Sequence, residues 1–299
     1  MSNRIHYISC PACAATNLSL ALKAKDYTVS GEVFEIYECA NCQLRFTQDV
    51  PDAAAIGPYY QSDSYISHTN TNKGLVNKLY HRVRSITLNQ KAKLIEATSK
   101  KSTGTLLDIG SGTGAFAAHM KIKGWRVTGL EPDASARSIA AATNKIQLLE
   151  SGELFQLPAG SFDIITMWHV LEHVHDLDAY LAQIKKLLAP GGWLLVAVPN
   201  YTSFDAGHYG EYWAAYDVPR HLYHFSPESM KELTKRFQMI VKDIKPMWFD
   251  SFYVSLLSEK YQFKKSSLLK GGWVGLLSNY HAFKKKNTCS SQIYLIQNH

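Results

Sequence analysis

Between residues 103 and 245 the apolar positions alternate between short continuous runs and stretches with helical spacing. Continuous runs of five or six apolar residues predict strands, and spacings of three and four predict helices. The predicted strands are Thr105–Ile109, Arg126–Leu130, Gln147–Leu149, Phe162–Met167, Trp193–Val198, Met239–Ile244 and Gln292–Ile296. The predicted helices are Phe116–Lys123, Ala134–Ala142, Leu177–Leu188 and one beginning at Ser226-Pro227. This order predicts an α/β fold with a doubly wound sheet of seven strands.

Two further segments interrupt or precede this alternation. Residues 51–72 are rich in Pro, Gly, Ser, Asn and Tyr, which predicts a linker, and an apolar stripe follows on a predicted helix. That stripe consists of Leu75, Leu79, Val83 and Ile86. A lysine-, tryptophan- and leucine-rich insertion at about 246–286 precedes the last strand, and we expect a helical cap there. The predicted units are therefore 1–50, 51–102 and 103–299.

Composition restricts the class of protein. The chain has 299 residues, 46% of them apolar, which is enough for a buried core and excludes an intrinsically disordered chain. No apolar run approaches the roughly 20 residues that a membrane-spanning helix needs. The first ten residues also lack the apolar stretch of a secretory signal, so we expect a cytoplasmic protein with reduced thiols.

Positive charge is unevenly distributed along the chain. The net charge is +7, from 32 basic and 25 acidic residues. Residues 73–101 carry eight Lys or Arg and one Glu, and residues 261–299 carry six Lys and no acidic residue. Solvated helix faces explain such segments most simply, and a nucleic-acid or membrane partner is the alternative.

Four of the five cysteines form two identically spaced pairs, Cys10-Pro-Ala-Cys13 and Cys39-Ala-Asn-Cys42. A tight turn with two residues between thiolates presents both sulfurs to one ion, so the spacing predicts a tetrahedral Zn²⁺ site. Four thiolates leave no open coordination position, and the predicted zinc is structural. A segment of about 50 residues has little core, so the metal would supply much of its folding free energy. The sequence predicts a small N-terminal zinc ribbon; two redox dithiols are the rival interpretation.

The first predicted core strand leads into a glycine-rich turn, Asp108–Ala115. The turn satisfies both the dinucleotide fingerprint G-x-G-x-x-G/A and the D-x-G-x-G-x-G pattern used for S-adenosylmethionine. Glu131 ends the second strand 21 residues after Gly110, where either cofactor needs an acid for its ribose hydroxyls. Charge separates the two, because a dinucleotide brings an anionic pyrophosphate whereas S-adenosylmethionine brings an ammonium and a sulfonium. Acidic strand ends favour the cationic cofactor.

Five motifs occur in order and at matching spacing: Asp108–Gly114, Glu131–Asp133, Phe162–Ile165, His169–Val174 and Leu188–Gly192. Together they resemble class I S-adenosylmethionine-dependent methyltransferases, in the branch related to ubiquinone-biosynthesis O-methyltransferases. The resemblance covers about residues 103–245 and implies a Rossmann-like methyltransferase fold.

The resemblance also implies roles for individual residues. Asp108 would hold the methionine ammonium and Glu131 the ribose hydroxyls. The remaining implied cofactor contacts are the loop residues Gly110, Ser111, Gly112 and Gly114, the adenine acceptor Glu153, the backbone of Leu154 beside the ring, and Trp168 on the cofactor's far side.

Two segments offer groups that would activate an acceptor. His169, Glu172 and His173 share one face if their segment is helical. Related O-methyltransferases can hold a divalent metal in this region, but there the position of His169 is commonly acidic. The long aromatic connection over 200–225 leaves the fifth strand at its ligand-binding edge and is typical of a lid. From it we predict His221 as the acid/base or acceptor-orienting group and Arg220 as an anion contact, with His173 as a further catalytic residue. The alternative is that these polar groups only hold the lid in place.

The sequence predicts methyl transfer to a small-molecule acceptor and leaves several alternatives open. An RNA acceptor is the main one, because a zinc ribbon before such a core resembles certain ribosomal-RNA guanine methyltransferases. Deoxysugar C-methyltransferases also carry an N-terminal zinc segment, with a longer C-terminal domain. A peripheral membrane contact or lipid-like acceptor would suit the lysine-rich insertion. A nicotinamide oxidoreductase and a non-catalytic cofactor-binding module are the remaining classes.

Overall fold

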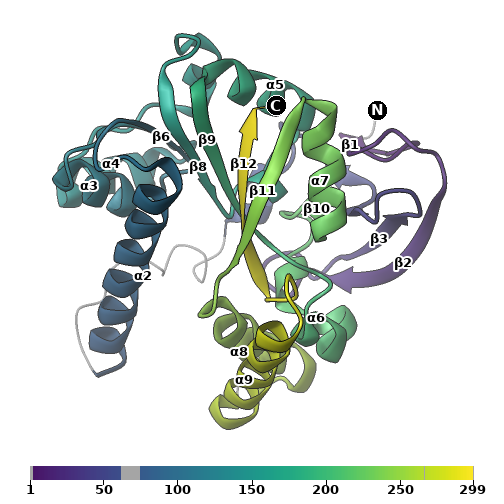
Figure 1. The fold of residues 1–299 in the computed structure, drawn as a ribbon. Coiled ribbons are helices and arrows are strands. Elements are labelled where there is room, and N and C mark those ends of the chain that lie inside the picture. The colour runs from purple at the N-terminus through teal and green to yellow at the C-terminus, as the bar shows by residue number, and fades with distance from the viewer. Residues whose placement is uncertain (1–2, 62–74, 266, 299) are drawn as a thin grey trace.

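A computed structural model describes residues 3–61, 75–265 and 267–298, with the backbone alone for 75–84. The central sheet contains six strands in the order β11-β12-β9-β8-β6-β7 (Figure 1). Its strands are β6 (Thr105–Ile109), β7 (Arg126–Leu130), β8 (Phe162–Trp168), β9 (Leu188–Pro199), β11 (Met239–Pro246) and β12 (Ser291–Asn298). The pairs formed by β6, β7, β8 and β9 are parallel, and β12 runs antiparallel to both of its neighbours. This is the predicted doubly wound α/β fold.

One predicted strand is not part of this sheet. The segment over 147–149 contributes only a single bridge, between Leu130 and Leu149. The chain enters a 3₁₀ turn at Ser151 immediately afterwards, so too few residues run beside β7 to form a ladder. The predicted count of seven strands was therefore wrong by one among the described residues.

Helices cover both faces of the central sheet. They are α2 (Leu75–Ser99), α3 (Ala115–Ile122), α4 (Ala134–Asn144), α5 (Leu177–Leu187), α6 (Phe204–Tyr209) and α7 (Pro227–Arg236). Neighbouring residues of one strand enter different cores, as a period of two requires: Leu106 packs with α2 and α3, and Leu107 packs with α5 and α7. The helix predicted up to Leu188 ends at Leu187, since β9 begins before Pro190-Gly191.

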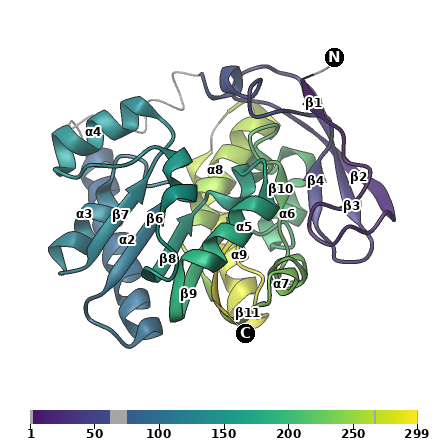
Figure 2. The same cartoon turned by 90° about the horizontal axis from the view of Figure 1, so that it is seen from above.

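The cysteine-rich segment forms a second sheet beside the central one. The strands β2 (Leu18–Lys25), β3 (Val33–Cys39) and β4 (Arg45–Thr47) are joined by β10 (Tyr223–His224) from the long connection. A two-stranded pair, β1 (Arg4–Ile5) with β5 (Val50–Pro51), flanks them. Figure 2 shows the ribbon strands β2, β3 and β4 on the side of the molecule where β10 lies. Buried ribbon residues such as Phe46 belong to the same apolar cluster as Phe225. The ribbon thus shares its core with the rest of the protein.

The insertion before the last strand is a helical hairpin of α8 (Asp250–Phe263) and α9 (Leu268–Lys284), close to the predicted limits. It lies beyond the end of the sheet at which the parallel strands terminate (Figure 1). A Cβ atom on Gly271 would lie 3.0 Å from the Cα of Leu256, and one on Gly275 would lie 2.9 Å from the Cα of Phe252. Glycine therefore lets the two helices pack closely.

Residues 62–72 of the predicted linker lie outside the described residues, as do residues 73 and 74 and the side chains of Leu75, Leu79 and Val83. Among the helices that the structure describes, none has both the length and the apolar character needed to cross a bilayer.

Candidate active site

The glycine-rich turn joins β6 to α3 and is held by backbone hydrogen bonds. The amides of Gly110 and Ser111 donate to the carbonyl oxygen of Leu130 at 2.8 and 2.9 Å. Gly110 has a φ of +73°, and a Cβ atom there would lie only 2.3 Å from Val170 Cγ2. Gly112 also has positive φ, but a Cβ atom there would meet nothing within 4 Å among the described residues. The turn is therefore tightly packed beneath Gly110 and open at Gly112.

Asp108 lies at the end of β6 and is almost completely buried, with 1% of its surface exposed. The hydroxyl of Thr166, on the adjacent strand β8, donates to Asp108 Oδ1 at 2.7 Å. Burial raises the pKa of Asp108 to about 6, although this hydrogen bond and the nearby Lys91 act in the opposite direction. The fold thus maintains a carboxylate at an unfavourable position beside the glycine turn.

Glu131 follows β7 and faces the same turn. Its Oε2 accepts from the amide of Gly112 at 2.7 Å, and its Oε1 accepts from the amide of Asp133 at 3.0 Å. Burial raises its pKa, and the two amide donors oppose that rise. The two sequence-predicted acids are therefore brought to opposite sides of the glycine turn by the register of β7, β6 and β8.

The other predicted cofactor residues occupy neighbouring strand ends. Ser111 donates from its hydroxyl to the backbone oxygen of Asp108 at 2.8 Å. Glu153 and Leu154 lie in a 3₁₀ turn, Glu153 half-buried and Leu154 fully buried. Trp168 ends β8 and contacts Phe116 of α3 edge to face, with ring centroids 5.5 Å apart.

A lysine that the sequence analysis missed completes this group. Lys91 of α2 places its ammonium 4.1 Å from the ring centroid of Trp168. Burial lowers the pKa of Lys91 to about 8, an effect reduced by the charges of Asp108 and Asp250. The helical spacing of α2 carries no signal for this role, because only the tertiary position of α2 brings Lys91 over the strand ends.

A second cluster lies just after β8. The carboxylate of Glu172 and one ring nitrogen from each of His173 and His221 lie within 4.8 Å of one another. Nδ1 of His173 lies 3.0 Å from the carbonyl oxygen of Arg220, and Nδ1 of His221 lies 2.8 Å from that of Ala215. A carbonyl oxygen only accepts, so both Nδ1 atoms carry a proton, and in the neutral form of either ring the lone pair is on Nε2.

Glu172 itself is fully buried, and neither carboxylate oxygen has a hydrogen-bond partner among the described residues. Burial and the neighbouring His221 lower the pKa of His173 to about 4, so that imidazole is neutral at physiological pH. A buried carboxylate beside two imidazole nitrogens is a donor set that fits a divalent cation or a shared proton.

His169 links this cluster to the cap. Its Nδ1 lies 3.4 Å from Glu172 Oε1, and its Nε2 lies 3.0 Å from Asp250 Oδ2 at the start of α8. Burial alone would lower the pKa of His169, but the two carboxylates raise it to about 10. The cationic His169 pairs with Glu172, whereas an acidic residue at this position would offer a further ligand to a metal ion. The local segment is also a 3₁₀ turn, η3 (Leu171–His173), and not the helix considered from the sequence.

Arg220 does not contact the cluster through its guanidinium. The side chain is fully buried, Nε and Nη2 donate to Asp217 at 3.0 and 2.6 Å, and Nη2 also donates to Asp26 at 3.0 Å. Nη1 donates to the carbonyl oxygen of Tyr59 at 2.8 Å. All three nitrogens donate to groups of the protein and the side chain is fully buried, so this arginine joins the ribbon to the long connection, and its guanidinium is not exposed for the predicted anion contact.

The four ribbon thiols converge as the spacing predicts. Cys10 Sγ lies 3.5 Å from Cys42 Sγ, and Cys13 Sγ lies 3.6 Å from Cys39 Sγ. All four ligand atoms lie within 4.8 Å of one another, close to the roughly 3.8 Å edge of a tetrahedron with 2.3 Å Zn–S bonds. The contact with Cys42 lowers the pKa of Cys10 to about 5. The four cysteines thus fit a structural Zn²⁺ ion.

Acidic strand ends around a glycine-rich turn, at the carboxyl edge of a doubly wound sheet, define a nucleoside-cofactor-binding α/β enzyme. Residues 80–240 match a family model described as a methyltransferase domain. This match covers more than half of the chain, and the protein therefore belongs to the methyltransferase domain family. The predicted class of enzyme is confirmed.

Individual relatives agree with this assignment. A ubiquinone biosynthesis O-methyltransferase from Caulobacter sp. (strain K31) is 42% identical over 106 residues, which are 32% of this chain and 41% of that protein. One from Chromobacterium violaceum is 28% identical over 148 residues, 46% of this chain and 60% of that protein. The chain thus spans about two-fifths to three-fifths of these curated relatives.

A solved structure of magnesium protoporphyrin IX methyltransferase from Synechocystis PCC 6803, with bound SAH, matches with a TM-score of 0.52. The alignment is 12% identical and covers 81% of this chain and 97% of that one. At this identity the likeness concerns the fold alone, and it confirms the predicted Rossmann-like methyltransferase architecture.

Proposed function

We propose that the protein transfers a methyl group from S-adenosylmethionine to a hydroxyl group of a small-molecule acceptor. The observation that carries the proposal is the pair of buried carboxylates, Asp108 and Glu131, facing a glycine turn that offers no cationic side chain of its own. Such a turn suits a ligand with an ammonium at one end and ribose hydroxyls at the other. It does not suit the pyrophosphate of a dinucleotide.

In this proposal the cofactor residues act as the family resemblance implies. Asp108 takes the methionine ammonium, Glu131 the ribose hydroxyls, Glu153 the adenine amino group, and Trp168 lines the far side. Lys91 adds a cation above Trp168, next to Asp108, where it would pair with the cofactor carboxylate. S-Adenosylmethionine supplies an activated methyl group, and the protein contributes positioning.

The acceptor side is formed by Glu172, His173 and His221. His221 Nε2 would take the hydroxyl proton as the methyl group transfers, while Glu172 stabilises the resulting imidazolium. The same three donors fit a divalent cation, which when bound would lower the pKa of the acceptor hydroxyl. Glu172 lies six residues beyond Thr166, the β8 partner of Asp108, so both sets of groups share one sheet edge.

Calorimetry with S-adenosylmethionine and with NAD tests the cofactor assignment, and release of S-adenosylhomocysteine tests turnover across phenols, catechols, sugars and RNA. We expect heat only with S-adenosylmethionine and turnover only with a hydroxylated small molecule. Binding of NAD in its place, or turnover confined to RNA, would refute the proposal.

Two histidine variants separate chemistry from folding. His221→Asn should reduce turnover by about 10²–10⁴-fold without changing cofactor affinity, because the base acts on the acceptor. His208→Asn is the matched control, since His208 is an exposed histidine of the same connection, stacked on Phe204. Equal turnover in the two variants would rule out His221 as the base.

A further inference from the structure

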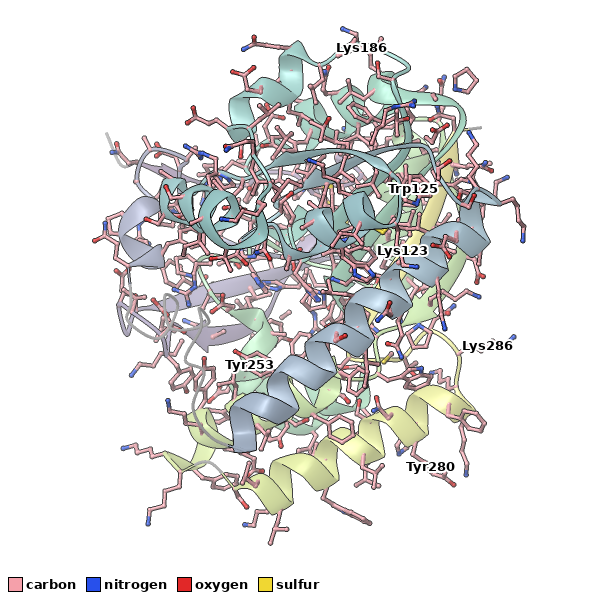
Figure 3. All side chains as sticks on the ribbon, turned by 90° about the vertical axis from the view of Figure 1, so that its left-hand side faces the viewer. Lys123, Trp125, Lys186, Tyr253, Tyr280 and Lys286 are labelled. Atoms are coloured by element: carbon pink, nitrogen blue, oxygen red, sulfur yellow. The ribbon has the colours of Figure 1, made fainter. Side chains whose placement is uncertain are left out.

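The helix α9 exposes a continuous apolar stripe. Leu269, Trp273, Leu276, Tyr280 and Phe283 follow one another at spacings of four, three, four and three residues, which places them on one face. Leu269 is 88% exposed, Trp273 61% and Phe283 81%. Figure 3 shows α9 along one end of the molecule, with Tyr280 labelled on it. A stripe of large side chains on a surface helix normally faces a core, so this one calls for a partner.

The opposite face of α9 already makes the contacts that hold the helix in place. Gly271, Val274, Gly275, Ser278 and Ala282 are buried, and the two glycines lie against the backbone of α8. The hydroxyl of Ser278 also donates to Asp205 of α6 at 2.6 Å. The small residues pack inward and the large ones point outward. The apolar stripe is therefore not needed for the packing of the hairpin.

The surroundings of the stripe are strongly cationic. Residues 261–299 contain six lysines and no acidic residue. Lys270 and Lys284 lie on α9 itself, over the rings of Phe263 and Tyr280 at 5.4 and 4.5 Å. Lys264 and Lys265 precede the helix, and Lys285 and Lys286 follow it. Ammonium groups thus flank the apolar stripe at both ends of α9.

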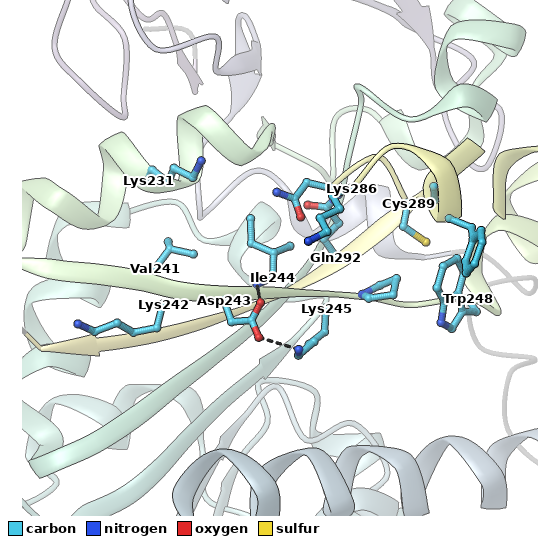
Figure 4. Close-up of a pocket in the computed structure, with 14 residues that line it drawn as sticks. Lys231, Val241, Lys242, Asp243, Ile244, Lys245, Trp248, Lys286, Cys289 and Gln292 are labelled. Atoms are coloured by element: carbon cyan, nitrogen blue, oxygen red, sulfur yellow. Dashed lines mark hydrogen bonds and ion pairs between the residues drawn. The ribbon is translucent and has the colours of Figure 1, made fainter. Parts of the chain in front are cut away.

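A basic cavity of about 510 Å³ continues this surface at the C-terminal end of α9 (Figure 4). Phe283 and Lys286 line it together with Lys231, Lys242 and Lys245 from α7 and β11. Asp243 pairs with Lys245 at 2.6 Å, so the lining keeps a positive excess. Apolar and anion-binding features therefore occur side by side.

We propose that α9 docks the protein on the surface of an anionic lipid bilayer. A helix of 17 residues is about 25 Å long, too short and too amphipathic to span a bilayer, but suited to lie in its interface. Leucine and tryptophan would enter the acyl boundary while the flanking lysines contact headgroup phosphates. A second copy of the chain is a poorer occupant, because a symmetric contact would bring two lysine-rich, acid-free faces together.

Docking through α9 would also bring the candidate active site close to the bilayer. The helix packs on α8, and Asp250 at the start of α8 contacts His169 beside the Glu172 cluster. Docking through α9 would hold the carboxyl edge of the sheet next to the bilayer, where an apolar acceptor concentrates. Membrane binding does not depend on the proposed methyl transfer and is measurable without turnover.

Flotation of the full-length protein with vesicles tests the proposal. We expect binding to phosphatidylcholine vesicles containing 30% phosphatidylglycerol, at least tenfold weaker binding to pure phosphatidylcholine, and loss of binding as NaCl is raised. The double variant Trp273→Ser/Phe283→Ser should lose at least tenfold in vesicle affinity. Because both side chains are exposed, its thermal unfolding should match that of the wild type.

Ile122→Ser is the matched control, since Ile122 is 86% exposed and belongs to α3, a different surface helix. It should bind vesicles like the wild type. Equal affinity for neutral and anionic vesicles, or equal binding by the stripe variant and the control, would overturn the proposal. So would a dimer in sedimentation that the stripe variant abolishes, because the occupant would then be a second copy.

Discussion

Replacing Asp108 by Asn separates cofactor binding from stability. The asparagine has nearly the same shape and its side-chain oxygen can still accept from Thr166, as Asp108 Oδ1 does at 2.7 Å. It removes only the buried negative charge. We expect the variant to be more stable than the wild type without ligand and to bind S-adenosylmethionine far more weakly, as strained functional sites allow.

The magnitude follows from the pKa of Asp108. Burial raises it to about 6 from 3.8. Each pKa unit corresponds to about 1.4 kcal/mol, so the ionised carboxylate costs about 3 kcal/mol in the folded state at neutral pH. The variant also weakens the hydrogen bond from Thr166 by about 1 kcal/mol. A gain in the free energy of unfolding of about 1–3 kcal/mol is therefore expected at pH 7.5.

The raised pKa of Asp108 also fixes how the stability of the wild type changes with pH. Since the folded-state pKa lies above the unfolded one, this group's contribution to stability is fully present below about pH 4. It is lost as the pH rises through about 6. The stability difference between variant and wild type should therefore shrink as the pH falls from 7.5 to 5. Urea unfolding at several pH values measures it.

Calorimetry measures the affinity of each protein for S-adenosylmethionine. Loss of a charged hydrogen bond of about 1.5–3 kcal/mol predicts roughly 10–150-fold weaker binding of S-adenosylmethionine. Methylthioadenosine, which lacks the amino-acid portion, should bind both proteins equally. Asp243→Asn removes the same charge from exposed β11 and should change neither property. A variant less stable than the wild type, with unchanged cofactor affinity, would refute the reasoning.

Four further changes have defined outcomes. Lys91→Met should raise the KM for S-adenosylmethionine about tenfold and leave methylthioadenosine inhibition unchanged; a parallel rise in both would contradict a carboxylate contact. Gly110→Ala, with its Cβ 2.3 Å from Val170, should lose about 1–3 kcal/mol in urea unfolding, and full stability would show that the turn yields. Cys42→Ser should abolish one equivalent of bound zinc by atomic absorption and lower the melting temperature; retained metal would exclude a four-thiolate site. Arg220→Met should destabilise the protein by about 3–5 kcal/mol, because Asp26 and Asp217 lose their ion pairs, and the acceptor KM of the folded fraction should not change. A raised acceptor KM without loss of stability would instead support the anion contact predicted from the sequence.

Local patterns in the sequence were sufficient for much of the fold. The glycine turn, the two cysteine pairs and most strands of the central sheet show in patterns of a few neighbouring residues. Ser226, for example, caps α7 as its position before Pro227 predicts. The strand predicted over 147–149 does not form because a strand needs a partner along several residues, and this segment pairs with β7 only through the bridge between Leu130 and Leu149.

The sequence likewise predicted some residues of the candidate site and missed or misassigned others. The sequence placed Asp108 and Glu131 correctly at strand ends beside the turn, since parallel strands end at one edge of a sheet. It did not reveal Lys91, whose helix precedes the sheet and reaches Trp168 only through packing. It also assigned Arg220 to the site, whereas a partner 194 positions away, Asp26, occupies that guanidinium.

The amino-acid sequence alone determined the family, the glycine turn and the two converging cysteine pairs, because these depend on short motifs with characteristic spacing. Only the tertiary structure decided which charges meet. His169 lies between Glu172 and Asp250, β10 extends the ribbon, and α9 turns its large side chains outward. Contacts between distant segments depend on how the elements pack, and a linear pattern of residues does not record that packing.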